Sequence, residues 1–313
     1  MSLLAPQGSP HGAGSAASIT LVTGANGLVG SRIVARLHQA GEQVVAAGRG
    51  PRRDAFGFDY VDLDLRNPER LAELIASLRP AGVIHAAAMT DVDACEKDPV
   101  EAWLLNVSAV QACALACRTL GARLTALSTD YVFDGAKGDY AEDDAPNPRG
   151  VYARTKRAGE EAALLLASDR ALCRVAVIYS GYTRAKRTFA SGAADNLLAG
   201  KPVKAFLDQV VTPTLADNAA EMVIAVHRSG AQGIFHCAGA SEVTRVEFCR
   251  ALARKLGADE SLIEPVRLAD LNLPAPRPLR SSLCTDKVKR LLGAGVPLPL
   301  DAALDRFLAE RRA

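Results

Sequence analysis

A short strand, a glycine-rich turn and a helix follow one another near the start of this chain. Residues 18–23 (S-I-T-L-V-T) are an apolar run, and Gly24, Gly27 and Gly30 follow at intervals of three before a helical pattern continues to about residue 40. This order predicts a dinucleotide-binding unit. Gly24 permits the tight turn, Gly27 lets the backbone approach a pyrophosphate, and Gly30 lets helix and strand pack closely. The free N–H groups at the helix start favour the pyrophosphate.

Strand and helix patterns then alternate without a break up to residue 179. The further strands are expected at residues 43–47, 59–65, 82–86, 122–127 and 171–179, with helices at 67–78, 99–120 and 152–167. This alternation predicts an α/β fold with a doubly wound parallel sheet of the Rossmann type.

The domain organisation follows from where this regular pattern starts and stops. We expect residues 18–179 to form the dinucleotide-binding domain and residues 180–313 to form mainly a smaller C-terminal substrate-binding lobe. Parts near 208–238 are candidates to return to the first domain. Residues 1–17 are rich in Ala, Gly, Ser and Pro, which predicts a disordered tail.

Composition narrows the classes of partner. The chain has 313 residues, of which 49% are hydrophobic, and a net charge of +2, so we expect neither nucleic acid nor membrane as a partner. The seven cysteines include no C-x-x-C pair, and His85, His227 and His236 have no partners at metal spacing. We therefore expect no metal, free thiols and a cytoplasmic location. The single tryptophan, Trp103, is expected in the core.

The end of the second strand bears on the choice of cofactor. An NAD-selective site usually has an acidic residue there, which holds the ribose 2′-hydroxyl. This chain has Arg49, Arg52 and Arg53 instead, and arginines suit the 2′-phosphate of NADP. We expect NADPH to be preferred, with NADH as the alternative. A solvated basic loop would give the same pattern.

Tyr152 and Lys156 are four residues apart on an expected helix and so share one face. An ammonium group near the phenol would lower the phenol's pKa and let Tyr152 exchange a proton with a substrate oxygen near neutral pH. Thr129, at the end of the strand before this helix, is expected where its hydroxyl meets the same oxygen. Each feature alone is more often a solvated helix face or a locally bonded threonine, and their combination argues for catalysis.

The chain resembles an extended short-chain dehydrogenase/reductase, because it carries that family's motifs in the same order. These are the glycine turn, Asn106, Thr129, and Tyr152 with Lys156. Within that family the chain is most similar to dTDP-4-dehydrorhamnose reductases. The further matches are residues 86–93 (A-A-A-M-T-D-V-D), residues 128–133 (S-T-D-Y-V-F), Asp208-Gln209 with Pro213-Thr214, and Arg277-Pro278 with Ser281 and Leu283.

The resemblance implies roles for individual residues. Tyr152 would be the general acid, Lys156 its activator and a ribose ligand, and Thr129 the group that orients the carbonyl. The implied cofactor site comprises Gly24, Asn26, Gly27, Leu28, Val29, Arg49, Asp64, Leu65, Ala86, Ala87, Ala88, Asn106, Tyr152 and Lys156. The implied substrate site comprises Thr90, Thr129, Asp130, Tyr152 and Arg277.

The expected substrate is a 4-keto sugar nucleotide, reduced with NADPH. Arg277 is the favoured ligand of its diphosphate, and the basic loop 183–188 is the alternative. The chain departs from the family at Val177, where the reductases usually carry a tryptophan. Another sugar-nucleotide dehydrogenase or epimerase therefore stays open, as does a non-catalytic regulator resembling that of methionine adenosyltransferase. A homodimer is an open alternative to a monomer.

Overall fold

A seven-stranded parallel sheet is the centre of the computed structural model, which describes residues 18–53, 57–182 and 187–312. The expected tail, residues 1–17, lies outside the described residues. Along the sheet the strands are β11 (Gly233–His236), β6 (Arg170–Val175), β5 (Arg123–Thr129), β4 (Gly82–His85), β1 (Thr20–Thr23), β2 (Val44–Gly48) and β3 (Asp59–Asp62). The strand order reverses between β1 and β4, which confirms the doubly wound parallel sheet.

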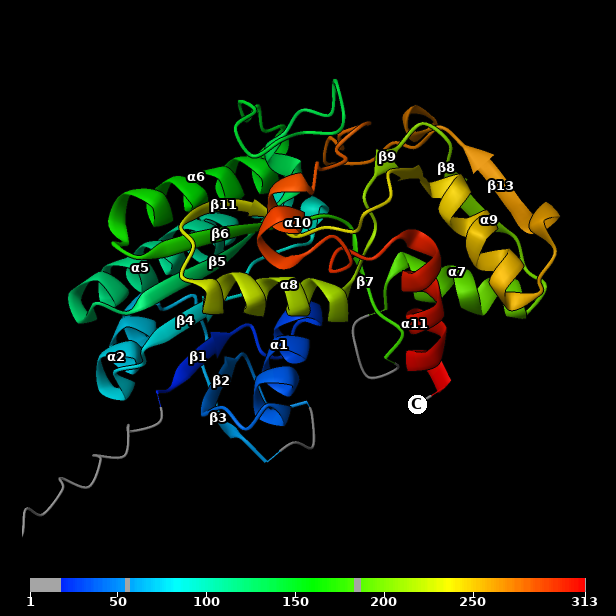
Figure 1. Cartoon of the computed structure of the whole chain (residues 1–313). Coiled ribbons are helices and arrows are strands. Elements are labelled where there is room, and N and C mark those ends of the chain that lie inside the picture. Colours follow the sequence, from blue (N-terminus) through cyan, green and yellow to red (C-terminus); the bar gives the residue numbers. More distant parts are fainter. Residues whose placement is uncertain (1–17, 54–56, 183–186, 313) are drawn as a thin grey trace, which may run out of the picture.

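Helices cover both faces of this sheet (Figure 1). Helices α1 (Leu28–Gln39) and α8 (Ala216–Ser229) share one hydrophobic cluster with the strands, and the short α10 (Asp286–Leu292) joins it. On the other face, α2 (Pro68–Leu78), α5 (Ala109–Leu120) and α6 (Gly150–Leu166) share a second cluster. Burial from both sides explains why β1, β2 and β4 are apolar or small along almost their whole length.

A smaller lobe packs around a third hydrophobic cluster, which includes Tyr179, Phe248 and Phe307. Its helices are α7 (Phe189–Leu198), α9 (Arg245–Leu256) and α11 (Leu300–Arg312). Its short strands are β7 (Ile178–Tyr179), β8 (Val203–Phe206), β9 (Val210–Val211), β10 (Thr214–Leu215), β12 (Val243–Thr244) and β13 (Ile263–Val266), which pair two by two. The chain leaves this lobe at α8 and β11, and β11 lies parallel to β6 at the edge of the main sheet.

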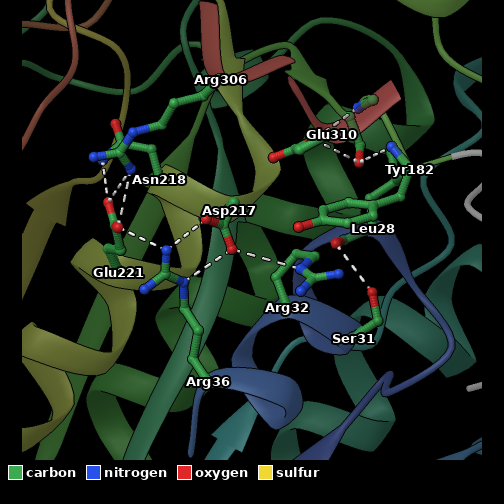
Figure 2. Close-up of polar contacts among 12 residues, drawn as sticks. Leu28, Ser31, Arg32, Arg36, Tyr182, Asp217, Asn218, Glu221, Arg306 and Glu310 are labelled. Atoms are coloured by element: carbon green, nitrogen blue, oxygen red, sulfur yellow. Dashed lines mark hydrogen bonds and ion pairs between the residues drawn. The ribbon is translucent and has the colours of Figure 1, made fainter. Parts of the chain in front are cut away.

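An ionic network joins the main sheet's helices to the last helix (Figure 2). Asp217 of α8 accepts from Arg36 of α1, and its Oδ1 lies 3.5 Å from the Nε atom of Arg32. Glu221, one turn further along α8, binds Arg36 on one side and Arg306 of α11 on the other. These side chains are only partly buried, so the ion pairs add little to the stability of the fold. Their main effect is to fix the position of α11 against α1 and α8.

Two expectations about the elements are wrong. The strand expected at 171–179 breaks after Val175, because Val177 has a φ of +40° and turns the chain out of the sheet, where β7 pairs with β10 instead. Trp103 is 50% exposed rather than in the core, because it ends α4 (Pro99–Trp103), on the outer surface.

The helix expected at 99–120 is continuous but contains one wider turn. It consists of α4, a π-helical turn at Leu104–Ser108, and α5. In the described part of the chain it is the one helix that length and composition would allow to cross a membrane. The helix instead forms part of the protein core, because α5 contributes buried residues to the cluster that it shares with α2. These residues are Ala109, Val110, Cys113, Ala114 and Cys117.

Helix α6 packs unusually close to the π turn because residue 159 is glycine. A Cβ atom at Gly159 would lie 2.2 Å from the carbonyl oxygen of Asn106. We predict that Gly159→Ala destabilises the protein by about 1–3 kcal/mol, the usual cost of overpacking. Urea unfolding measures the change, with Gly295→Ala as the control because no atom lies within 4 Å of a Cβ there. Equal stability of the two variants would contradict this packing argument.

Candidate active site

The ends of β5 and α6 bring Thr129 and Tyr152 together. Helix α6 begins at Gly150, whose φ of +75° favours glycine, so Tyr152 lies in the first turn. The Thr129 hydroxyl lies close enough to the Tyr152 phenol to influence the phenol's pKa. The ring of Tyr131 packs edge-on against that of Tyr152, with 5.7 Å between centroids. The structure thus joins the hydroxyl and the phenol that the sequence paired.

Asp130 lies beneath this pair and is 2% exposed. Its Oδ1 atom accepts a hydrogen bond of 3.1 Å from Thr129, and its Oδ2 atom accepts one of 2.5 Å from Ser281. Burial raises the pKa of the Asp130 carboxyl to about 6, although both hydrogen bonds oppose the rise. Asp130 therefore orients the Thr129 hydroxyl, and keeping its carboxylate charged in this buried position costs free energy of folding.

Lys156 is on the same side of α6 as Tyr152, as its spacing predicts, but its ammonium group has a different partner. The Nζ atom donates to the carbonyl oxygen of Leu127 at 2.8 Å, and burial lowers the pKa of Lys156 to about 8. Burial also raises the pKa of the Tyr152 phenol above its ordinary value, and the nearby Thr129 hydroxyl only partly opposes the rise. The expectation of a lowered phenol pKa is therefore wrong in this structure, because burial disfavours the charged phenolate and the nearby Asp130 and Tyr131 act in the same direction.

Asn106 is fully buried in the π turn and braces the neighbouring strand end. Its side chain accepts from the backbone N–H of Met89 at 2.9 Å and donates to the carbonyl of Met89 at 3.2 Å. It also donates to Thr155 at 3.1 Å, and Thr155 follows Tyr152 by three residues on α6. Asn106 thus ties the segment after β4 to helix α6.

The glycine turn has the shape that a pyrophosphate requires. Gly24 has a φ of +70°, and a Cβ there would lie 2.6 Å from the backbone nitrogen of Ala87. A Cβ at Gly30 would lie 2.2 Å from the carbonyl oxygen of Gly24. No side chain caps the start of α1 at Gly27, so the N–H groups of its first turn are available to an anion. These residues fit a dinucleotide cofactor, with Ala86, Ala87 and Ala88 partly exposed beside them.

Asn26 shapes the loop that follows β2. Its amide nitrogen donates to the carbonyl oxygens of Arg49 and Pro51 and to the hydroxyl of Tyr60, while its oxygen accepts from the backbone of Arg53. The Asn26 side chain thus holds the arginine loop in position. The side chain of Arg49 itself is exposed and accessible to a ligand.

Two other predicted cofactor residues, Asp64 and Leu65, follow β3, the strand that pairs with β2. Asp64 pairs with Arg66, which lowers the pKa of the carboxyl, and the charge of Arg49 lowers it further. Leu65 is buried beside it, and Leu28 and Val29 form the first turn of α1.

The predicted diphosphate ligands are less favourably arranged. Arg277 donates to Asp93 at 2.7 Å and to the carbonyl oxygen of Ala275 at 2.7 Å, so its charge is already paired. Of the loop 183–188, residues 183–186 lie outside the described residues, and Arg187 is exposed and paired with Asp195. Thr90 is exposed.

A glycine cradle, a Ser-Thr strand end and a Tyr-x-x-x-Lys helix on a doubly wound sheet define a dinucleotide-dependent oxidoreductase. The model of the RmlD substrate binding domain family matches residues 18–312. The chain belongs to this family and thus to the extended short-chain dehydrogenases/reductases, as its sequence indicated. It is an NAD(P)-dependent enzyme, and its relatives support a sugar-nucleotide reductase.

Three similar proteins illustrate this. The probable low-salt glycan biosynthesis reductase Agl14 of Haloferax volcanii is 37% identical over 92% of this chain and 98% of its own. The dTDP-4-dehydrorhamnose reductase of Mycobacterium tuberculosis is 33% identical over 84% of each chain. The solved dTDP-4-dehydrorhamnose reductase of Bacillus anthracis, in complex with NADP, has a TM-score of 0.83 over 94% of this chain and 99% of its own. At 24% identity, that last likeness shows the fold.

For two residues near the site, Ser281 and Arg245, the sequence did not indicate the contacts that the structure shows. The role of Ser281 as the partner of Asp130 depends on a contact between residues 151 positions apart, which no local pattern indicates. Arg245 also lies close enough to Asp130 and Tyr131 for the charges to interact. The sequence did contain one indication for Arg245. A cation at the first position of a helix is disfavoured by the helix dipole, so an arginine there indicates a role other than helix stabilisation.

The pKa of Asp130 predicts how stability changes with pH. Because folding raises this pKa from 3.8 to about 6, the stabilising contribution is complete below about pH 4 and is lost as the pH rises through 6. At pH 7.5 the buried charge then costs about 3 kcal/mol, from about two pKa units. We predict that Asp130→Asn is more stable than the wild type at pH 7.5, by up to about this amount, and that the gain vanishes near pH 4.

Denaturant unfolding at both pH values measures this gain. The exposed Asp143 provides a matched control, since Asp143→Asn should change stability little at either pH. A stability gain in Asp130→Asn that is the same at pH 4 and pH 7.5 would show that the buried charge is not its source.

Proposed function

We propose that this protein is an NADPH-dependent reductase of a 4-keto sugar nucleotide, similar to dTDP-4-dehydrorhamnose reductase. The proximity of the Thr129 hydroxyl to the phenol of Tyr152 carries this proposal, because together they form an oxygen-orienting group and a proton donor near the strand ends. The relatives named as reductases support it. A cytoplasmic location and a homodimer are parts of the same proposal.

The chain's own residues would act in three ways. The cofactor, when bound, supplies the hydride that reaches the ketone carbon. Tyr152 gives its proton to the ketone oxygen as negative charge develops there, and the Thr129 hydroxyl holds that oxygen. Lys156 holds positive charge beneath the site and is a candidate ligand of the cofactor ribose. The raised pKa of the phenol keeps it protonated before transfer, as a general acid requires.

The preference for NADPH rests on the loop after β2. Its arginines are held in place by Asn26, and no acidic residue ends the strand. Similar folds have been solved with NADP and with NAD, so the arginine loop carries the choice between the two cofactors.

The identity of the sugar is the open part of the proposal. Val177, where the reductases usually carry tryptophan, has a left-handed backbone conformation at the junction of the two lobes. This difference favours a test with several keto-sugar nucleotides that vary in base and sugar. Turnover of at least one supports the reductase, whereas cofactor binding without any turnover favours a regulator.

The role of Tyr152 predicts the effect of removing its hydroxyl. Tyr152→Phe should abolish nearly all reduction while leaving NADPH affinity close to normal, because the ring stays and the proton donor goes. Steady-state kinetics and fluorescence titration measure the two effects, with Tyr182→Phe as a control outside the hydroxyl pair. If Tyr152→Phe kept more than about a tenth of kcat, a loss below ~1.4 kcal/mol, another group would be the acid.

The arginine loop predicts a selective loss of NADPH binding. Arg49→Ala should weaken NADPH binding by about 1.5–3 kcal/mol, the scale of a charge-assisted hydrogen bond, and leave NADH binding nearly unchanged. Calorimetric titration with both cofactors measures this, with the exposed Arg118→Ala as the control. Equal losses for NADPH and NADH would rule out a contact with the 2′-phosphate.

A further inference from the structure

Arg245, the first residue of α9, belongs to the substrate lobe but lies beside the catalytic strand end. Three chain segments connect the two places. Ser281 donates to Asp130, and the backbone N–H of Ser281 donates to the carbonyl of Val210 at 3.0 Å. Val210 in turn pairs with Thr244 across the short sheet of β9 and β12. A continuous layer therefore runs from Asp130 to the start of α9.

The side chain of Arg245 is fixed against this layer. Its Nε atom donates to the side chain of Gln209 at 3.1 Å, and its guanidinium lies over the ring of Phe189 at 4.0 Å. Gln209 is itself buried and donates to the carbonyl oxygen of Pro278. The guanidinium is thus held in one place before any ligand arrives, which reduces the entropy cost of binding one.

The charge of Arg245 lacks a counter-ion among the described residues. Its Nη1 atom is sealed from solvent and has no hydrogen-bond partner there, and no described carboxylate lies within 4.0 Å of the guanidinium. Burial lowers the pKa of Arg245, while Asp130 and Tyr131 attract its charge only from further away. Its place at the helix start is also unfavourable for a cation, because the helix dipole is positive there.

Helix α9 does not need this arginine for its own start. Thr244 and Glu247 form a complete capping box, in which each side chain binds the backbone of the other residue. A buried, preorganised and unpaired guanidinium beside the reacting groups is therefore explained by an anionic ligand. Arg277 provides the contrast, since Asp93 already neutralises it.

We propose that Arg245 binds the diphosphate of the sugar nucleotide. This inference rests on the proposed function, because a sugar held at Thr129 and Tyr152 has its diphosphate as the next group outward. The planar guanidinium suits two phosphate oxygens at once, and the phosphate charge supplies the counter-ion that the described protein lacks. Arg277 then serves to fasten the segment that carries Ser281, rather than to bind the diphosphate.

Two substitutions at Arg245 separate charge from packing. Arg245→Met removes the charge and keeps a long side chain over Phe189, whereas Arg245→Lys keeps the charge. Arg250→Met is the matched control, because Arg250 is exposed on the same helix. The probes are the nucleoside diphosphates dTDP, UDP, GDP and CDP, titrated calorimetrically into each variant saturated with NADP. NADPH affinity and the melting temperature are measured alongside.

We expect Arg245→Met to weaken the binding of the tightest-binding nucleoside diphosphate by about tenfold or more, which is the scale of lost charge-assisted hydrogen bonds. Arg245→Lys should recover part of this loss, and Arg250→Met should equal the wild type. NADPH affinity should change less than twofold in all variants, which distinguishes the substrate's phosphates from those of the cofactor.

Two results would overturn the assignment while leaving the reductase intact. One is wild-type diphosphate affinity in Arg245→Met. The other is an equal loss in the Met and Lys variants together with a lower melting temperature, which would make Arg245 structural. If the wild type bound none of the four nucleoside diphosphates, the proposed function itself would fail together with this inference.

Discussion

The buried ion pair between Glu160 and Arg174 fixes helix α6, which carries Tyr152 and Lys156. The two side chains are 2% and 0% exposed as residues, and Arg174 donates to both carboxylate oxygens at 2.7 and 2.9 Å. Burying two charges is costly, so the pair adds little net stability, but losing either partner would strand the other. Because Glu160 is one turn beyond Lys156, this bond sets how α6 faces β5 and β6. The positions of Tyr152 and Lys156 on this helix therefore depend on the ion pair.

Burial, more than charge, determines the protonation states at this site. It raises the pKa of Tyr152 and Asp130 and lowers that of Lys156, so each group is moved toward its neutral form. A neutral phenol is the form that can donate a proton, and an ammonium whose pKa is near 8 can respond to charge that develops close by. The simple estimate from the Tyr–Lys spacing missed this, because it counted the attraction and left out the cost of desolvation.

The sequence predicted what local patterns encode. Strand, glycine turn and helix identified the cofactor half, since Gly24 and Gly30 are required by contacts within or next to the motif itself. The sheet and the Thr129–Tyr152 pair followed from the alternation of elements. The partners of Asp130 and Arg277, and the place of Arg245, could not be predicted, because they depend on how distant segments fold back together. Resemblance to the family pointed to Arg277, and only the contact with Asp93 reveals that its charge is already paired.

The backbone conformation explains why residue 177, where the chain has valine instead of the family's usual tryptophan, is structurally important. A β-branched residue with a positive φ is strained, and such strain persists only where the surrounding structure enforces it. Here β6 is held in the sheet by β5 and β11, while Tyr179, two residues later, is fully buried in the other lobe among Phe248 and Phe307. Glu310 of α11 then accepts from the backbone N–H of Gly181 at 2.8 Å and secures the far side of this crossing. Val177 is thus the point where the main sheet turns into the smaller lobe, and its strained backbone is kept by strands on one side and a buried aromatic cluster on the other.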